Sequence, residues 1–165
     1  MAEERNRSTT EYLDMLITSM EKKSAVLDEL LAVNEEQEAL FDSGLPREEA
    51  LDDIIERKGV LIDRLDSLDD GFESVYDRIS SDIKADPSGY SSQVKRLKVL
   101  VGEVTDKSAK LGVAEARQRE KADRIFENLK KEIAEGRKAS KTAYGYYQNM
   151  KQYSSPKPNF FDIKN

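Results

Sequence analysis

The chain has no cysteine, no histidine and no tryptophan among its 165 residues, and it has only four prolines. Without cysteine it can form neither disulfides nor thiolate metal sites. Without histidine it lacks the commonest general base at neutral pH and the commonest zinc ligand. No run of about 18 apolar residues is present, and the first residues lack the apolar stretch of a signal peptide. These absences predict a cytoplasmic protein with no metal, no cofactor and no membrane insertion.

Charged residues make up 36% of the chain and hydrophobic residues 38%, a balance typical of long helices with one buried stripe. Residues 1–83 carry 23 acidic and nine basic side chains, whereas residues 84–165 carry ten acidic and 18 basic ones. We interpret this asymmetry as a basic third helix that packs against two acidic helices. A nucleic-acid surface is the alternative, but the acidic half would repel phosphates, so we expect no nucleic-acid partner.

Apolar residues recur every seven positions in three long segments. The first segment, about 8–42, opens with a capping box from Ser8 to Glu11. The second, about 46–84, opens at Pro46, and the third, about 87–152, follows an Asp-Pro-Ser-Gly interruption. The seams are Leu13, Met20, Leu27, Asn34 and Phe41; Leu51, Lys58, Leu65, Phe72 and Ile79; and Tyr90, Leu97, Val104, Leu111 and Ile125.

These seams predict an all-α fold. Short connections favour an antiparallel helical hairpin, on which a longer third helix completes a three-helix bundle or coiled coil. We expect one helical domain over residues 1–153 and a flexible tail over 154–165. The tail carries an apolar cluster at Phe160, Phe161 and Ile163, which is unusual for a segment that docks nowhere.

The carboxylates do not suggest an active site. Pairs such as Asp52-Asp53 and Asp69-Asp70 are adjacent, so on a helix they point about 100° apart and do not converge. The chain also lacks a Glu-x-x-His metal motif, a phosphate-binding loop and a Gly-rich dinucleotide fingerprint. We therefore expect a protein that is not an enzyme.

The end of the third segment carries uncharged residues of the kind favoured at interfaces. Tyr144, Tyr146, Tyr147 and Met150 lie within seven positions. Either they form a binding surface or they close the end of the bundle core. Just upstream, small residues that include Ala139 and Ala143 fall at helical spacing, on which another helix could pack closely.

The segment Leu51–Tyr76, LDDIIERKGVLIDRLDSLDDGFESVY, resembles the second helix of the FlgN-like flagellar export chaperones. Leu27–Leu31 and Glu35–Glu38 are similar to the opening helix of that family, and Lys58 interrupts the apolar seam in a similar way. The resemblance covers nearly the whole chain, as a pattern of amphipathic helices with few fixed residues. The tail through Phe160 and Phe161 departs from the shorter family pattern.

This resemblance implies a cytoplasmic chaperone that binds the C-terminal helical segment of hook–filament junction proteins, FlgK-like or FlgL-like. The chaperone prevents their premature association and delivers them to the flagellar export gate. By the same resemblance, client binding belongs to the distal part of the third helix, and one tyrosine docks at the gate. The client-binding residues would be Ile125, Phe126, Leu129, Ile133, Ala139 and Ala143, and the docking tyrosine would be one of Tyr144, Tyr146 and Tyr147.

Two other functions fit the same pattern. A FliT-like chaperone of the filament cap protein uses a similar helical bundle. A structural coiled-coil protein that self-associates, for example as a homodimer, is the alternative from a different class. Polar seam positions such as Asn34 and Lys58 are relevant to self-association, because such residues can specify the register or the oligomeric state of a coiled coil.

Overall fold

The computed structural model describes residues 2–136, and the side chains of that range except those of residues 2, 5 and 6. The predicted all-α class is confirmed: within this range the elements are four α-helices and one 3-10 turn, without a strand. The chain divides into two compact units. Of the described residues, unit 1 comprises 2–29 and 60–108, and unit 2 comprises 30–59 and 109–136.

Helix α1 runs over Ala2–Asp42, so the predicted start at Ser8 is wrong. The first residues favour a longer helix, because Glu3 and Glu4 place negative charge at its positive end. Thr9 is not part of a cap. Its side chain is buried, and its hydroxyl donates a hydrogen bond of 2.9 Å to Asp82 Oδ2.

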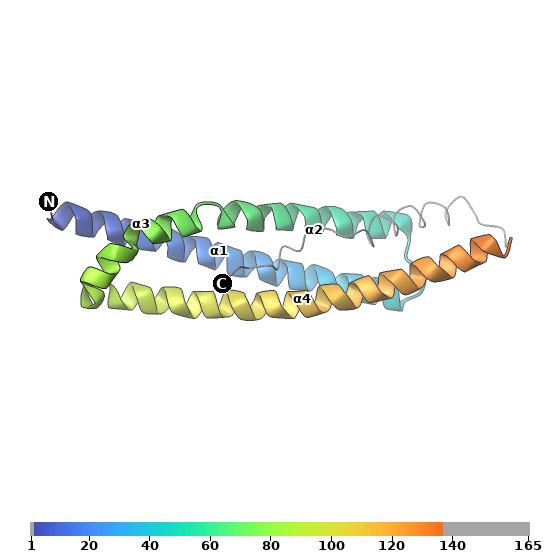
Figure 1. Cartoon of the computed structure of the whole chain (residues 1–165). Helices are drawn as coiled ribbons and strands as arrows, with labels where there is room; N and C mark the ends of the chain where they lie inside the picture. Colours follow the sequence, from blue (N-terminus) through green and yellow to red (C-terminus); the bar gives the residue numbers. More distant parts are fainter. Residues whose placement is uncertain (1, 137–165) are drawn as a thin grey trace. The chain divides into compact units, whose positions relative to one another are not determined.

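The single helix predicted over residues 46–84 is two helices, α2 over Glu48–Asp69 and α3 over Phe72–Ala85 (Figure 1). Gly71 separates them with a φ of 82°, in the left-handed region that glycine adopts without strain. The apolar spacing continues across this break, since Leu65 and Ile79 are both buried. The seven-residue repeat therefore does not reveal where α2 ends.

The predicted interruption before the last helix is confirmed. Pro87–Tyr90 form the 3-10 turn η1, and the carboxylate of Asp86 accepts a hydrogen bond of 3.3 Å from the Gly89 amide. Helix α4 then covers Ser91–Ala134. It ends there because Gly136 has a φ of 69°, so the third helix predicted over about 87–152 does not continue through this residue. Residues 137–152 and the tail 154–165 lie outside the described residues.

Most of the predicted seam residues are buried. All five of α1, Asn34 included, are buried, and so are Leu51, Lys58 and Leu65 in α2, Ile79 in α3, Tyr90 in η1, and Leu97, Val104 and Leu111 in α4. Two predicted seam residues, Phe72 and Ile125, are only partly buried. In unit 1, α4 carries Leu97, Leu100 and Val104 on its buried side. None of the described helices combines the length and the apolar character needed to cross a membrane.

The interpretation of the charge asymmetry is supported by ion pairs between α4 and α1. In unit 1, Lys107 pairs with Asp28 at 2.9 Å and Arg96 pairs with Glu21 at 3.4 Å. In unit 2, Arg117 and Lys121 both pair with Glu38, and Lys121 also reaches Asp42 at 2.5 Å. The basic side chains of α4 thus face acidic side chains of α1 in each unit.

Candidate functional site

Unit 2 contains a polar layer at positions where the helix seams would otherwise be apolar. We use this name for five residues on three helices: Asn34 and Gln37 of α1, Lys58 of α2, and Glu115 and Gln118 of α4. Asn34, Gln37 and Gln118 are at most 2% exposed, and Lys58 is 6% exposed. A group this buried needs partners inside the protein, since water cannot supply them.

Lys58 is the centre of the layer. Its Nζ lies 2.5 Å from Glu115 Oε1 and donates hydrogen bonds to Gln37 Oε1 at 3.1 Å and to Asn34 Oδ1 at 3.4 Å. Asn34 Nδ2 in turn donates to Glu115 Oε1 at 3.0 Å and to the Leu30 carbonyl at 3.1 Å. The ion pair of Lys58 with Glu115 joins α2 to α4, and its hydrogen bonds to Asn34 and Gln37 connect both helices to α1.

The two glutamines of the layer have side-chain atoms without a hydrogen-bond partner in the described part of the chain. Among the described residues, Gln37 Nε2 has no hydrogen-bond partner, and neither does Nε2 or Oε1 of Gln118. Gln118 follows Glu115 by three positions and so lies on the same face of α4. The side-chain amide of Gln118 is fully buried while both of its polar atoms are unpaired.

A small apolar cluster lies further along α4 in unit 2, near the turn between α1 and α2. Phe41, Leu51 and Ala122 are its buried members. Leu40, Ile55, Ile125 and Phe126 pack against them while partly exposed. Two of the predicted client-binding residues, Ile125 and Phe126, thus contact the protein's own core.

The other described client-binding candidates lie further along α4. Leu129 is 3% exposed and Ile133 is half-buried. In Figure 1 the C-terminal end of α4 extends beyond the turn between α1 and α2. Ala139, Ala143, Tyr144, Tyr146 and Tyr147 lie outside the described residues.

No family model, no curated protein and no solved structure matches the chain. Its function must therefore be argued from its own residues.

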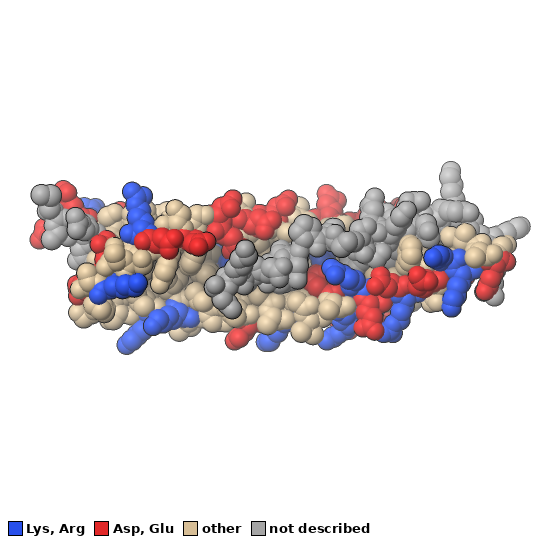
Figure 2. All heavy atoms as spheres, in the orientation of Figure 1, with Lys and Arg blue, Asp and Glu red and all other residues tan. Residues whose placement is uncertain are grey.

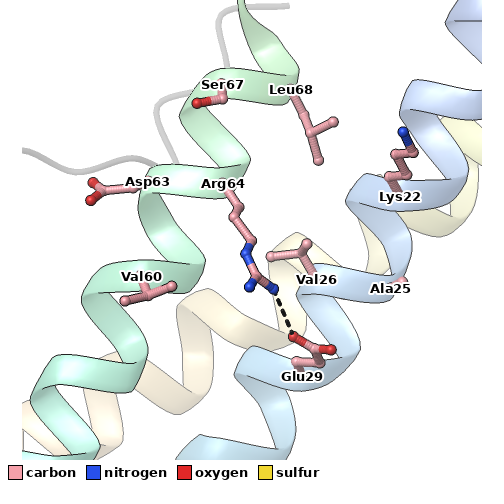
Figure 3. A pocket seen from close by; sticks show the side chains of 9 residues that line it. All are labelled: Lys22, Ala25, Val26, Glu29, Val60, Asp63, Arg64, Ser67 and Leu68. Atoms are coloured by element: carbon pink, nitrogen blue, oxygen red, sulfur yellow. Dashed lines mark ion pairs between the residues drawn. The ribbon is translucent and has the colours of Figure 1, made fainter.

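Unit 1 contains a groove of about 650 Å³ between α1 and α2. Val26 and Leu68 point into it from the two helices, and Arg64 extends across it to pair with Glu29 at 3.9 Å (Figure 3). Its lining residues are Lys22, Ala25, Val26 and Glu29 of α1 and Val60, Asp63, Arg64, Ser67 and Leu68 of α2. The groove thus has an apolar floor and charged edges.

Acidic side chains gather over the same part of α2. Asp63, Asp66, Asp69 and Asp70 are exposed there, and Figure 2 shows the Asp and Glu atoms over the second half of α2. Asp69 is paired with Lys23 of α1. Within the described residues no three acidic side chains are grouped closely enough to hold a metal ion.

Two ion-paired cations outside the polar layer have raised pKa values. The hydrogen bond to Glu36 raises the pKa of Arg57, and Asp53 adds to the effect. The hydrogen bond to Asp42 likewise raises the pKa of Lys121. The Arg57 side chain is 43% exposed, so solvent and salt screen its pairs.

Sequence reasoning identified Asn34 and Lys58 as polar seam residues but missed their partners. Gln118 lies midway between Leu111 and Ile125 on the seven-residue line of α4, so its burial was readable from the spacing. Gln37 and Glu115 stand three residues from buried seam positions, and only the structure shows that they face Lys58.

Proposed function

We propose that this protein is a FlgN-like flagellar export chaperone, in which α1 and α2 form an antiparallel hairpin and α4 is the longer third helix. It would bind the C-terminal helical segment of FlgK-like or FlgL-like subunits and deliver it to the export gate in the cytoplasm. The observation that supports this proposal most directly is that the apolar side of α4 is only partly covered. Ile125 and Phe126 pack on the Phe41 cluster while remaining partly exposed, and α4 continues beyond it.

The chemistry of this surface suits a helical client. An amphipathic helix binds by laying its apolar side along a partner at positions spaced three and four residues apart. Ile125, Phe126, Leu129 and Ile133 have that spacing, and charged Lys130, Lys131 and Glu132 separate the last two. A client helix could therefore be covered by the same side chains that now contact the turn region of unit 2.

Two polar seam residues, Asn34 and Lys58, were the reason to consider a self-associating coiled coil. Polar seam residues that specify a dimer find their partners in the second copy. Here Lys58 and Asn34 are paired with Glu115 and with each other inside one chain. These two residues need no second copy to be satisfied, so they give no support to self-association.

The test is isothermal titration calorimetry of the full chain with a synthetic C-terminal helical segment of a FlgK-like or FlgL-like subunit. Ile133→Asp is the informative variant, because Ile133 is only half-buried. Leu129→Asp would also damage the core, since Leu129 is 3% exposed. We expect Ile133→Asp to weaken client binding at least about tenfold, which corresponds to about 1.4 kcal/mol.

Val113→Asp is the matched control. Val113 is an apolar residue on the same helix and in the same unit, it is 62% exposed, and it lies about 200° around the helix from Ile133. This variant should bind the client as the wild type does. Equal affinity of both variants would place the site elsewhere, and no wild-type binding at about 100 μM would overturn the chaperone proposal.

A further inference from the structure

The side-chain amide of Gln118 is the least satisfied group in the described core. It is 0% exposed, and neither of its polar atoms has a hydrogen-bond partner there. An amide in this state has lost its hydration and gained nothing in return, which raises the free energy of the closed arrangement. When α4 separates from its neighbours at this point, water can reach both atoms.

Beyond Gln118, few contacts hold α4 in unit 2. The buried residues of α4 past this point are Ala122 and Leu129, and Ala122 contributes only a methyl group. Ile125 and Phe126 are partly exposed, and the ion pairs of Lys121 with Glu38 and Asp42 are partly exposed too, so solvent weakens them. Before Gln118 the helix is held by the buried pair of Glu115 with Lys58 and by Leu111.

We propose that α4 opens at the polar layer: the pair of Glu115 with Lys58 holds the helix, and the segment after Gln118 detaches from α1 and α2 of unit 2. Opening exposes Ile125, Phe126 and Leu129 together. Their role as client-binding residues rests on the proposed function, whereas the opening itself does not. In the closed state the chaperone thus shields its apolar surface with its own cluster, and a client competes with Phe41 and Leu51 for the same side chains.

Hydrogen exchange of the full chain, measured by mass spectrometry, tests the opening without any client, because a helical segment that loses its packing is only marginally stable in water and its amides then exchange. Gln118→Leu replaces the unpaired amide by an apolar group of similar size. We expect it to slow exchange of the amides in 119–134 at least tenfold and to leave those in 91–108 unchanged. Gln118→Met, which is unbranched and adapts to its surroundings, serves as the second variant in case leucine packs poorly.

Gln93→Leu is the matched control, the same chemical change on the same helix. Gln93 is half-buried in unit 1, and its amide donates a hydrogen bond of 2.8 Å to Asp14 Oδ1. It should not slow exchange in 119–134. Unchanged or faster exchange of that segment in both Gln118 variants would overturn the opening, whatever the client does.

The client titration separates the two proposals. If opening precedes binding, Gln118→Leu should weaken client affinity by the same factor by which it slows exchange. Slower exchange with unchanged affinity would overturn the competition between client and cluster. Slower exchange in a protein that binds no client would overturn the proposed function and leave the opening established.

Discussion

Replacement of Lys58 by methionine removes the charge at the centre of the polar layer while keeping a side chain of similar length. The ammonium of Lys58 is paired with Glu115 at 2.5 Å and donates hydrogen bonds to Gln37 and Asn34. After Lys58→Met, the carboxylate of Glu115 retains only the hydrogen bond from Asn34 among its partners in the layer. A carboxylate without its cation is then left at the helix interface.

The magnitude follows from burial. Removing one partner of a buried ion pair costs about 3–5 kcal/mol, because it strands an uncompensated charge. The Glu115 side chain is 18% exposed and keeps part of its hydration, so we expect Lys58→Met to lower the free energy of unfolding by about 2–3 kcal/mol. Glu115→Leu should cost about 3 kcal/mol, since the ammonium it strands is only 8% exposed.

The double variant Lys58→Met/Glu115→Leu carries neither charge. Well-packed apolar replacements of a buried pair are often neutral or stabilising, but here the side-chain oxygens of Gln37 and Asn34 lose their donor. We therefore expect the double variant to be about 1–3 kcal/mol less stable than the wild type, well short of the sum of the two single variants. Urea unfolding, monitored by circular dichroism, gives the free energy of unfolding of the wild type and the three variants. With a slope of about 2 kcal/mol per molar urea, each single variant should lower the midpoint by about 1–1.5 M.

Arg57→Met is the control for these variants, because Arg57 is the neighbour of Lys58 and is also ion-paired, with Glu36 and Asp53. Its side chain is 43% exposed, so the loss should stay within about 0.5 kcal/mol. The reasoning is refuted if Lys58→Met is as mild as Arg57→Met, or if the double variant is destabilised by the sum of the two single ones.

Two further changes test the fold of unit 1. Gly71→Ala should lower the free energy of unfolding by about 1 kcal/mol, because alanine is strained at a φ of 82°; urea unfolding measures it, and unchanged stability would contradict the left-handed turn between α2 and α3. Thr9→Val should lower it by about 1 kcal/mol through loss of the hydrogen bond to Asp82. If Thr9→Val were neutral in the wild type and in an Asp82→Ala background alike, Thr9 and Asp82 would not be coupled.

The sequence was most informative where a residue's neighbours along one helix decide its environment. The seven-residue spacing identified the buried seams of α1, α2 and the first part of α4, even at the polar positions Asn34 and Lys58. It also identified the Asp86–Gly89 interruption, whose residues form their turn locally.

The spacing failed where helix ends depend on single residues. The break at Gly71 leaves Leu65, Phe72 and Ile79 seven apart, so only the adjacent Asp70-Gly71 pair, a common turn signal, marked it. The start of α1 was missed because Ser8 fits a cap pattern, although good helix formers precede it. Neither error changes the fold class.

The contacts within the polar layer could not be predicted from the sequence, for a different reason. Its members come from three helices, and their contacts join positions up to 81 residues apart, as between Asn34 and Glu115. Spacing within one helix cannot show which residue of another helix lies opposite. The client-binding candidates on α4 stay a prediction, since their partner lies outside the chain.

The pair of Lys58 with Glu115 also bears on how the chain avoids misfolding. Apolar seams that repeat every seven residues look nearly the same after a slip of one repeat. If α4 slipped by seven residues in either direction, Ser108 or Ala122 would take the place of Glu115, and the ammonium of Lys58 would lose its counter-charge. Misaligned chains would therefore carry a bare buried charge, so one ion pair allows the folding chain to discriminate between alignments that its leucines and valines cannot distinguish.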